Sequence, residues 1–283
     1  MPPTIATALH AALARLTRAG ADAGDARLDA EVLLAHALDK PRSHLRAWPE
    51  RVLTPEQAAR YEELVARRAG GEPVAHILGR REFWSLDLDV TPATLIPRPE
   101  TELLVELALA RIPADAALAV ADLGTGTGAI ALAVARERPR CRVTATDRSA
   151  AALEVARRNA ARLGIGGIDF RHGAWYAPLA GLRFDLILSN PPYVRADDPH
   201  LAQGDVRFEP PGALVAGADG LDDLRVIVAG APEHLHGGGW LLVEHGYDQG
   251  GAVAALFRTA GFADVGTIRD LNGQPRVTIG RRP

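Results

Sequence analysis

Asn190 and the residues that follow it have the types and spacing needed to hold a substrate nitrogen. The stretch SNPPYV (189–194) completes the apolar run FDLILS (184–189). Pro191 and Pro192 lack backbone N–H groups and have a fixed φ, so they end a strand ladder and stiffen the turn. The side-chain oxygen of Asn190 and the carbonyl of Pro191 are then two fixed acceptors. Beside a methyl donor, they would orient the electron pair of a substrate N–H₂ group without a strong base.

Tyr193 ends the tetrapeptide NPPY (190–193), and its ring would pack against a flat substrate group and exclude water. The alternative interpretation is an ordinary strand-terminating turn, in which Asn190 caps its own backbone. A binding site for a methyl donor near this turn would favour the role in substrate binding, because an oriented nitrogen needs a donor of the methyl group beside it.

A glycine-rich loop in DLGTGTGAI (122–130) is the candidate cofactor site. Glycines permit a tight turn and close approach of a ligand, and the following helix offers N–H groups. A pyrophosphate loop has the spacing G-x-G-x-x-G, whereas this loop has G-x-G-x-G with Asp122 just before it. A carboxylate there repels a pyrophosphate and attracts a cationic amino-acid group. The loop therefore favours S-adenosylmethionine, which carries ammonium and sulfonium charges. Its contact residues would be Gly124, Thr125, Gly126, Thr127 and Gly128.

Asp147 ends the next apolar run, CRVTATD (141–147). A carboxylate about 20 residues after the glycine loop is placed to accept hydrogen bonds from both ribose hydroxyls of a nucleoside cofactor. The alternative is structural: Asp122 would cap a turn, and Asp147 would cap the helix that begins near Ser149.

Alternating strands and helices after Pro113 must position these residues. Strands are expected at 117–124, 141–147, 168–173, 184–190, 239–246, 263–270 and 275–282, and helices at 128–139, 149–164, 225–235 and 251–262. Such alternation specifies an α/β fold with a doubly wound, mostly parallel sheet covered on both faces. Ligands bind these sheets at the carboxyl edge of the strands. The turns after Leu123, Thr146 and Ser189 lie on that edge.

The N-terminal part has a different pattern. Residues 4–70 show helical spacing, best seen in TPEQAARYEELVARRAGG (54–71), where Thr54 and Gln57 form a capping box and Pro55 suits the first helical position. Residues 74–92 alternate and predict a β-hairpin or an extended linker. We therefore expect a helical bundle at 1–73, a hairpin linker at 74–93 and a ligand-binding domain at 94–283.

Composition narrows the class of protein. The 283 residues carry a net charge of −3, which disfavours a surface built to neutralise many phosphates. Cys141 is the only cysteine, so internal disulfides are excluded, and the nine histidines lack metal-ligand spacing. We expect no metal. No stretch approaches the length of a membrane span, and we expect a cytoplasmic protein that is a monomer.

Longer segments resemble a known enzyme family. DLGTGTGAI, Asp147 and NPPY look like the class I S-adenosylmethionine-dependent methyltransferases that modify exocyclic or amide nitrogens. The segments that resemble the release-factor glutamine N5-methyltransferases (the PrmC/HemK family) are GRREFWSLDLDVTPATLIPRPETELLVE (79–106), DVRFEPPGALVAGADGL (205–221), LLVEHGYDQG (241–250) and RDLNGQPRVTIGR (269–281).

The resemblance implies a helical bundle that recognises the substrate protein, a hairpin linker and a seven-stranded methyltransferase domain. The implied substrate is the glutamine of the GGQ loop in class 1 peptide-chain release factors. By matching position, Gly124–Gly128, Asp147, Trp175 and Asn190 would contact the cofactor, and Asn190, Pro191, Pro192 and Tyr193 the glutamine. Where the family usually carries an acidic residue before this tryptophan, the chain has Ala174, which offers no side-chain acceptor for the adenine amino group.

Several assignments remain open at the level of sequence. Arg98, Glu100 and Glu102 in RPETE either guard the pocket mouth or complement a helix dipole. The runner-up function is a nucleic-acid adenine or guanine N-methyltransferase, and a third is a non-catalytic module with a vestigial pocket. The charge and the helical bundle disfavour the runner-up, and we expect no direct nucleic-acid binding.

Overall fold

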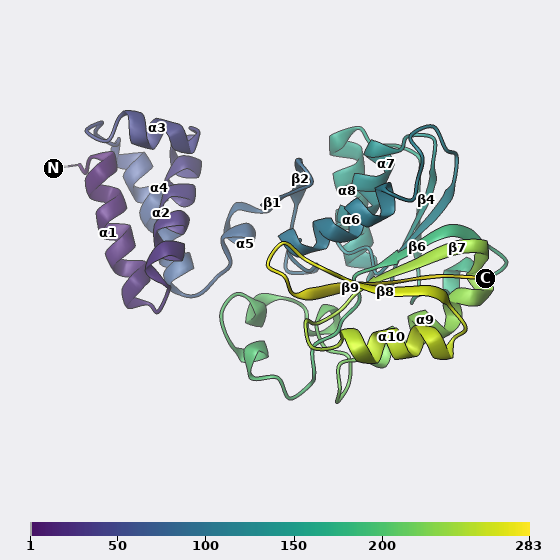
Figure 1. Cartoon of the computed structure of the whole chain (residues 1–283). Coiled ribbons are helices and arrows are strands. Elements are labelled where there is room, and N and C mark those ends of the chain that lie inside the picture. The colour runs from purple at the N-terminus through teal and green to yellow at the C-terminus, as the bar shows by residue number, and fades with distance from the viewer. Residues whose placement is uncertain (1) are drawn as a thin grey trace. The chain divides into compact units, whose positions relative to one another are not determined.

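The computed structural model describes residues 2–283, which divide into two compact units (Figure 1). The first unit contains the chain up to residue 79 together with 202–208, and the second contains 80–201 and 209–283. The functional roles assigned above to 1–73, 74–93 and 94–283 stay predictions.

The first unit is built from helices around an apolar core. These are α1 (Ile5–Arg18), α2 (Ala23–Leu38), α3 (Arg42–Ala47), α4 (Pro55–Ala69) and α5 (Val74–Leu78). The capping box is confirmed: the Gln57 N–H donates to Thr54 Oγ1, and the Thr54 N–H donates to the Gln57 side chain. Buried side chains from all five helices form the core.

Arg68 joins residues 202–208 to the helices of the first unit. Its Nε lies 2.7 Å from Asp29 Oδ2, and its Nη1 lies 2.6 Å from Asp205 Oδ1. The side chains of Arg68 and Asp29 are 16% and 15% exposed, whereas that of Asp205 is 40% exposed, so the network is buried at its Arg68–Asp29 pair and half-buried at Asp205. Arg68 and Asp205 are 137 residues apart in the sequence.

The start of the expected hairpin segment is wrong, because residues Val74–Leu78 form the helix α5. The hairpin itself is confirmed as antiparallel strands β1 (Arg80–Phe83) and β2 (Leu86–Asp89). Trp84 and Ser85 join the strands, and both have positive φ. Positive φ at both central residues is the requirement of a type I′ turn, which glycine and asparagine usually meet.

The second unit contains the expected α/β sheet, with seven strands in the order β5-β4-β3-β6-β7-β9-β8. The strands are β3 (Ala119–Leu123), β4 (Arg142–Asp147), β5 (Ile168–His172), β6 (Phe184–Ser189), β7 (Leu235–Glu244), β8 (Ala263–Arg269) and β9 (Pro275–Arg281). Strands β3 to β7 pair in parallel, and β9 runs antiparallel to both of its neighbours. The predicted fold class is therefore confirmed.

Helices cover both faces of this sheet, as Figure 1 shows. One face packs against α6 (Glu102–Leu109), α7 (Ala129–Glu137) and α8 (Ala150–Leu163), and the other against α9 (Asp222–His234) and α10 (Gly250–Thr259). Side chains alternate accordingly: Val120 enters the first core, while Ala121 and Leu123 enter the second. None of the helices between residues 2 and 283 is long and apolar enough to cross a membrane.

The remaining short helical segments are η1 (Pro99–Thr101), η2 (Ala177–Leu179), η3 (Pro199–Ala202), η4 (Val206–Phe208) and η5 (Pro211–Ala213). Because β3, β4, β6 and β7 are parallel, their carboxyl ends meet at one edge of the sheet. The glycine loop, Asp147, Asn190 and Glu244 stand at those four ends.

Candidate active site

A cavity in the second unit opens at this carboxyl edge. Its wall includes eight of the predicted site residues: Gly124, Thr125, Gly126, Thr127, Asp147, Trp175, Asn190 and Pro192. Gly128, Pro191 and Tyr193 do not belong to the wall. Thr101, to which no sequence pattern gave a role, does belong to the wall, as do Arg98 and Ala174.

The glycine loop needs its glycines for conformation and for close packing. Gly124 and Gly128 have φ of 74° and 85°, where a side chain is strained. A Cβ on Gly124 would also lie 3.1 Å from the Trp175 ring, and one on Gly128 would lie 3.2 Å from the Ala156 Cβ. The loop therefore carries Trp175 directly against its backbone and brings α7 close to α8.

Most of the loop's N–H groups are already used inside the protein. The N–H groups of Gly124 and Thr125 both donate to the Thr146 carbonyl at 2.9 Å, and the N–H of Gly126 donates to Asp147 Oδ2 at 2.9 Å. A phosphate-binding loop instead leaves its N–H groups for the anion. This arrangement agrees with the expectation that the loop does not hold a pyrophosphate.

Asp122 is fully buried and ties the loop to α7. Its Oδ2 accepts hydrogen bonds from Thr125 Oγ1 (2.6 Å) and from the Ala131 N–H (3.2 Å), whereas its Oδ1 has no partner among the described residues. Burial raises the pKa of Asp122 to about 7. The turn-capping interpretation is the one that the structure supports for Asp122.

Asp147 connects the glycine loop to the next helix. Besides the bond from Gly126, its Oδ1 accepts a hydrogen bond from the Ser149 N–H at 2.8 Å. The N-cap of α8 is Ser149 itself, whose Oγ accepts a hydrogen bond from the Ala152 N–H at 3.2 Å, so the alternative in which Asp147 caps this helix is wrong. A carboxylate oxygen can accept more than one hydrogen bond, and Asp147 also lines the cavity. The carboxylate can therefore hold the residue that caps α8 and still face a ligand.

The Asn190 side chain is oriented by Thr101. Asn190 Nδ2 donates to Thr101 Oγ1 at 3.0 Å. Asn190 Oδ1 is buried and has no hydrogen-bond partner among the described residues. A buried amide oxygen without a partner is costly, so it is a place where a ligand N–H would be favourable. The acceptor end of the amide is thus the end left for the cavity.

Tyr193 lies behind the cavity wall and is held at two points. Its hydroxyl donates to Glu244 Oε1 at 3.2 Å, and its carbonyl accepts a hydrogen bond from Gln249 Nε2 at 2.9 Å. Burial raises the pKa of Tyr193, so the phenol stays neutral. Its ring also packs against the core between the sheet and α9 and α10. These contacts fix the turn that carries Asn190.

Glu244 and Gln249 are site residues that sequence reasoning missed. They lie in LLVEHGYDQG (241–250), a segment that resembles the enzyme family but has no local pattern that indicates a role for either residue. Glu244 is 1% exposed, and burial raises its pKa to about 7 although Thr101, Arg276 and Tyr193 each lower it. Its Oε2 has no partner at hydrogen-bond distance among the described residues. Glu244 is therefore a buried carboxyl directly behind the Asn190 turn.

The RPETE residues have separate roles. Arg98 lines the cavity and forms an ion pair with the buried Glu209, whose Oε2 accepts a hydrogen bond from the Ile96 N–H at 2.9 Å. Glu102 Oε1 instead accepts a hydrogen bond from the Trp84 N–H at 2.8 Å, at the hairpin turn. Neither Glu100 nor Glu102 belongs to the described cavity wall.

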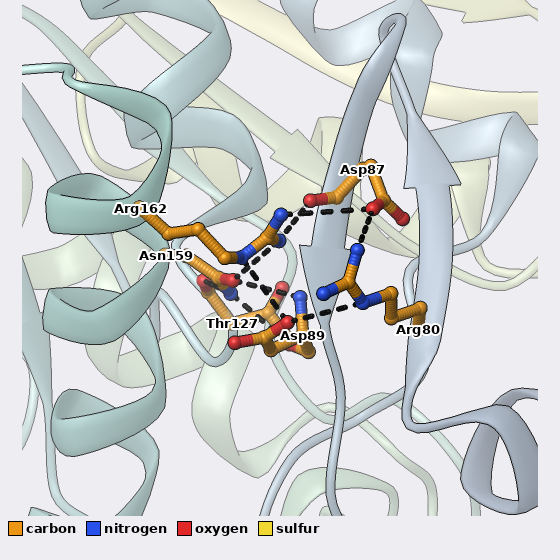
Figure 2. A network of polar contacts seen from close by, with 6 residues as sticks. All are labelled: Arg80, Asp87, Asp89, Thr127, Asn159 and Arg162. Atoms are coloured by element: carbon orange, nitrogen blue, oxygen red, sulfur yellow. Dashed lines mark hydrogen bonds and ion pairs between the residues drawn. The ribbon is translucent and has the colours of Figure 1, made fainter.

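A polar network connects the hairpin to the glycine loop (Figure 2). Asn159 of α8 is completely buried; its Oδ1 accepts from the Asp89 N–H at 2.7 Å, and its Nδ2 donates to the Asp89 and Thr127 carbonyls at 3.0 Å. Two arginines form ion pairs with the carboxylates of the hairpin strand β2. Arg162 Nε lies 3.2 Å from Asp89 Oδ1, and Arg80 Nη1 lies 2.6 Å from Asp87 Oδ2. The Asn159 side chain therefore holds both the hairpin and the glycine loop.

Family models match both parts of the chain. The PrmC N-terminal domain matches residues 7–79, and the methyltransferase small domain matches residues 100–205. Among curated proteins, the chain is 59% identical over 260 residues to the release factor glutamine methyltransferase of Pseudomonas aeruginosa, covering 92% of this chain and 94% of that protein. It is 54% identical over 285 residues to the protein of the same name from Vibrio cholerae, covering 99% of this chain and 98% of that protein.

A solved structure shares the fold at lower identity. The 16S rRNA N2 G1207 methyltransferase of T. thermophilus, in complex with AdoMet and guanosine, aligns with a TM-score of 0.53 at 18% identity, over 72% of this chain and 50% of that chain. This likeness concerns the fold alone.

Proposed function

Because the chain belongs to the family of release factor glutamine methyltransferases, we propose that it transfers a methyl group from S-adenosylmethionine to the side-chain amide nitrogen (N5) of a release-factor glutamine. The glutamine is that of the GGQ motif in class 1 peptide-chain release factors. The partner is therefore a protein and not a nucleic acid.

The observation that carries this proposal is the unpartnered oxygen of Asn190. Asn190 Oδ1 is buried, and Asn190 shares a cavity wall with the glycine loop and Asp147. A glutamine amide brings two N–H donors, and Asn190 Oδ1 and the Pro191 carbonyl supply two acceptors. Within residues 2–283, no hydrogen bond uses the Pro191 carbonyl, and Pro191 lies between two residues of the cavity wall, Asn190 and Pro192.

The chain's residues fit S-adenosylmethionine. Gly124–Gly128 would lie beside the amino-acid part, Asp147 would accept the ribose hydroxyls, and Trp175 with the Ala174 backbone would border the adenine. The carboxylate of Asp147, which belongs to the cavity wall, disfavours an anionic ligand at the same place. When bound, the cofactor supplies an electrophilic methyl group on a sulfonium.

The chain's contribution to the reaction is orientation. An amide nitrogen is a poor nucleophile, because its electron pair is delocalised into the carbonyl. Asn190 Oδ1 and the Pro191 carbonyl would hold its two hydrogens and draw positive charge away from the nitrogen as it attacks the methyl carbon. As the N–C bond forms, the electron pair of the broken S–C bond would stay on the sulfur of the cofactor, which would leave as a neutral thioether, and the methylated nitrogen would release one of its two protons to solvent water. Such positioning lowers the barrier without a strong base.

The helical unit and the hairpin would recognise the surface of the substrate protein. Binding energy from such remote contacts is used to orient the reacting group. A free glutamine or a short peptide lacks those contacts and should be methylated poorly.

The decisive experiment supplies purified release factor and methyl-labelled S-adenosylmethionine to the full chain, and then maps the label by peptide mass spectrometry. We expect one label on the glutamine of the GGQ motif, and little label on a GGQ peptide. Matched reactions with duplex DNA and ribosomal RNA test the runner-up function. Efficient labelling of nucleic acid, with none on release factor, would overturn the proposal.

A further inference from the structure

We infer that Thr101 is a positioning residue that selects which end of the Asn190 amide faces the substrate, and that Glu244 sets the direction of the Thr101 hydroxyl. The inference rests on the proposed function, because it concerns the acceptor that holds the substrate amide. It assigns a task to two residues that do not belong to the NPPY tetrapeptide.

The argument begins with the two ends of the Asn190 amide. Rotation of the amide by half a turn exchanges its oxygen and its nitrogen, and only the oxygen can accept a substrate N–H. Asn190 Nδ2 donates to Thr101 Oγ1 at 3.0 Å, which leaves Oδ1 buried without a partner. If the Thr101 hydroxyl donated instead of accepting, the rotated amide would be favoured and a donor would face the substrate.

The direction of the Thr101 hydroxyl depends on where its own proton points. Thr101 is 4% exposed, so few water molecules can compete for that proton. Glu244 is buried behind the Asn190 turn, where its Oε1 accepts a hydrogen bond from the Tyr193 hydroxyl at 3.2 Å and its Oε2 has no partner at hydrogen-bond distance among the described residues. The Thr101 hydroxyl also lowers the pKa of this carboxyl. An ionised Glu244 can only accept. It therefore attracts the Thr101 proton and leaves the Thr101 oxygen to accept from Asn190.

Three elements supply this chain of contacts. Thr101 ends η1, Asn190 follows β6, and Glu244 ends β7. The groups that act on Glu244 are Arg276 of β9, which favours the ionised carboxylate, Glu100 of η1, which opposes it, and the hydroxyl of Tyr193. A protonated Glu244 would itself hold a proton to donate, and the Thr101 hydroxyl would no longer be directed by it.

The first test compares Thr101→Val with Thr101→Ser. Valine has nearly the shape of threonine but has no hydroxyl, whereas serine keeps the hydroxyl. For Thr101→Val, we expect single-turnover kcat on release factor to fall about tenfold or more, with KM for release factor changed less than about threefold. Thr101→Ser should restore most of the rate. Equal kcat for Thr101→Val and the wild type would overturn the inference.

A second measurement does not depend on activity. The Asn190 side-chain amide signals can be assigned in a ¹⁵N NMR spectrum by their loss in Asn190→Ala. In the wild type, one of the two amide protons should exchange slowly with solvent because it is bonded to Thr101 Oγ1. In Thr101→Val that protection should disappear, while the dispersion of the backbone amide signals shows that the variant is still folded. Unchanged protection would contradict the assigned contact.

The third measurement is the pH profile of kcat with Glu244→Gln as the variant. The pKa of Glu244 is about 7, so wild-type kcat should rise about tenfold between pH 6 and pH 8, as expected for one essential ionised group. Glutamine does not ionise, and Glu244→Gln should be slower at pH 8 and nearly independent of pH. The same acid limb in both proteins would show that Glu244 does not set the hydroxyl.

The two proposals fail in different ways. If the proposed function is wrong, the wild-type chain will not methylate release factor at any pH. If only the present inference is wrong, the wild type will be active, Asn190→Ala will be impaired, and Thr101→Val and Glu244→Gln will behave like the wild type.

Discussion

At the scale of the single residue, Asn190 carries the sharpest expectation. Asn190→Ala removes the acceptor at the cavity wall and should lower single-turnover kcat by roughly 10²-fold, the effect of losing one preorganised polar group. S-adenosylmethionine affinity should fall much less. Asn190→Asp keeps an acceptor, but its charge attracts the sulfonium and its second oxygen would turn the Thr101 hydroxyl around, so we expect partial activity at most. A near wild-type rate for Asn190→Ala would return the turn to a purely structural role.

Asp147 is the matching residue on the cofactor side. Asp147→Ala should weaken S-adenosylmethionine binding by about 1.5 to 3 kcal/mol, the range for lost hydrogen bonds to a charged group. Isothermal titration calorimetry measures this loss directly. Asp147→Asn is the control, because it keeps one acceptor oxygen and should lose less. An affinity equal to that of the wild type in Asp147→Ala would remove this residue from the site.

At the scale of elements, Asn159 connects α8, the hairpin and the glycine loop. Asn159→Ala leaves the buried Asp89 N–H and the Thr127 carbonyl without their partner. We expect the free energy of unfolding to fall by about 2 to 3 kcal/mol, measured by urea denaturation. Arg157→Ala is the control on the same helix, because its ion pair with Glu154 is exposed and should contribute less than about 1 kcal/mol. Equal losses in the two variants would contradict the role of Asn159.

The elements of the sheet were predictable because their signal is local. Apolar runs alternate with helical periods, and each of the seven expected strands is present. The type of the hairpin turn could not be predicted from the sequence, because Trp84 and Ser85 are not residues that usually adopt positive φ. The helix α5 was missed because it spans only Val74–Leu78.

The candidate site was only partly predictable, for a different reason. The glycine loop, Asp147 and Asn190 follow strands, and the parallel fold alone places strand ends together. Thr101 meets Asn190 across 89 residues, and Tyr193 meets Glu244 across 51 residues. No local period reports such pairings, because they arise only when η1, β6 and β7 pack side by side.

At the scale of the whole molecule, buried carboxyls make stability depend on pH. Burial raises the pKa of Asp122 and of Glu244 to about 7 in the folded chain, whereas both are near 4 when unfolded. Between these values the folded state binds more protons, so the free energy of unfolding should fall as pH rises from about 5 to 7. At 1.4 kcal/mol per pH unit, each carboxyl should lower the free energy of unfolding by on the order of 3 kcal/mol over these two pH units.

Chemical denaturation at pH 5, 6, 7 and 8 measures this dependence. Burial lowers the pKa of His245, which opposes the trend, so the difference between wild type and Glu244→Gln is the clearest quantity. The variant should gain stability relative to the wild type as pH rises, with no further gain above about pH 8. A difference that is constant across this range would show that Glu244 is not protonated in the fold.

The contact between Arg68 and Asp205 also has a consequence in time. A ribosome makes the helices of the first unit at the start of synthesis, but Asp205 follows Arg68 by 137 residues. At about 5 to 20 residues per second, the helices wait roughly 7 to 30 seconds for this partner. Of its two ion-pair partners, Asp29 precedes Arg68 in the sequence and is the one already synthesised during that interval. The first unit is thus completed only after β3 to β6 have been made, while β7, β8 and β9 of the sheet are still to be synthesised.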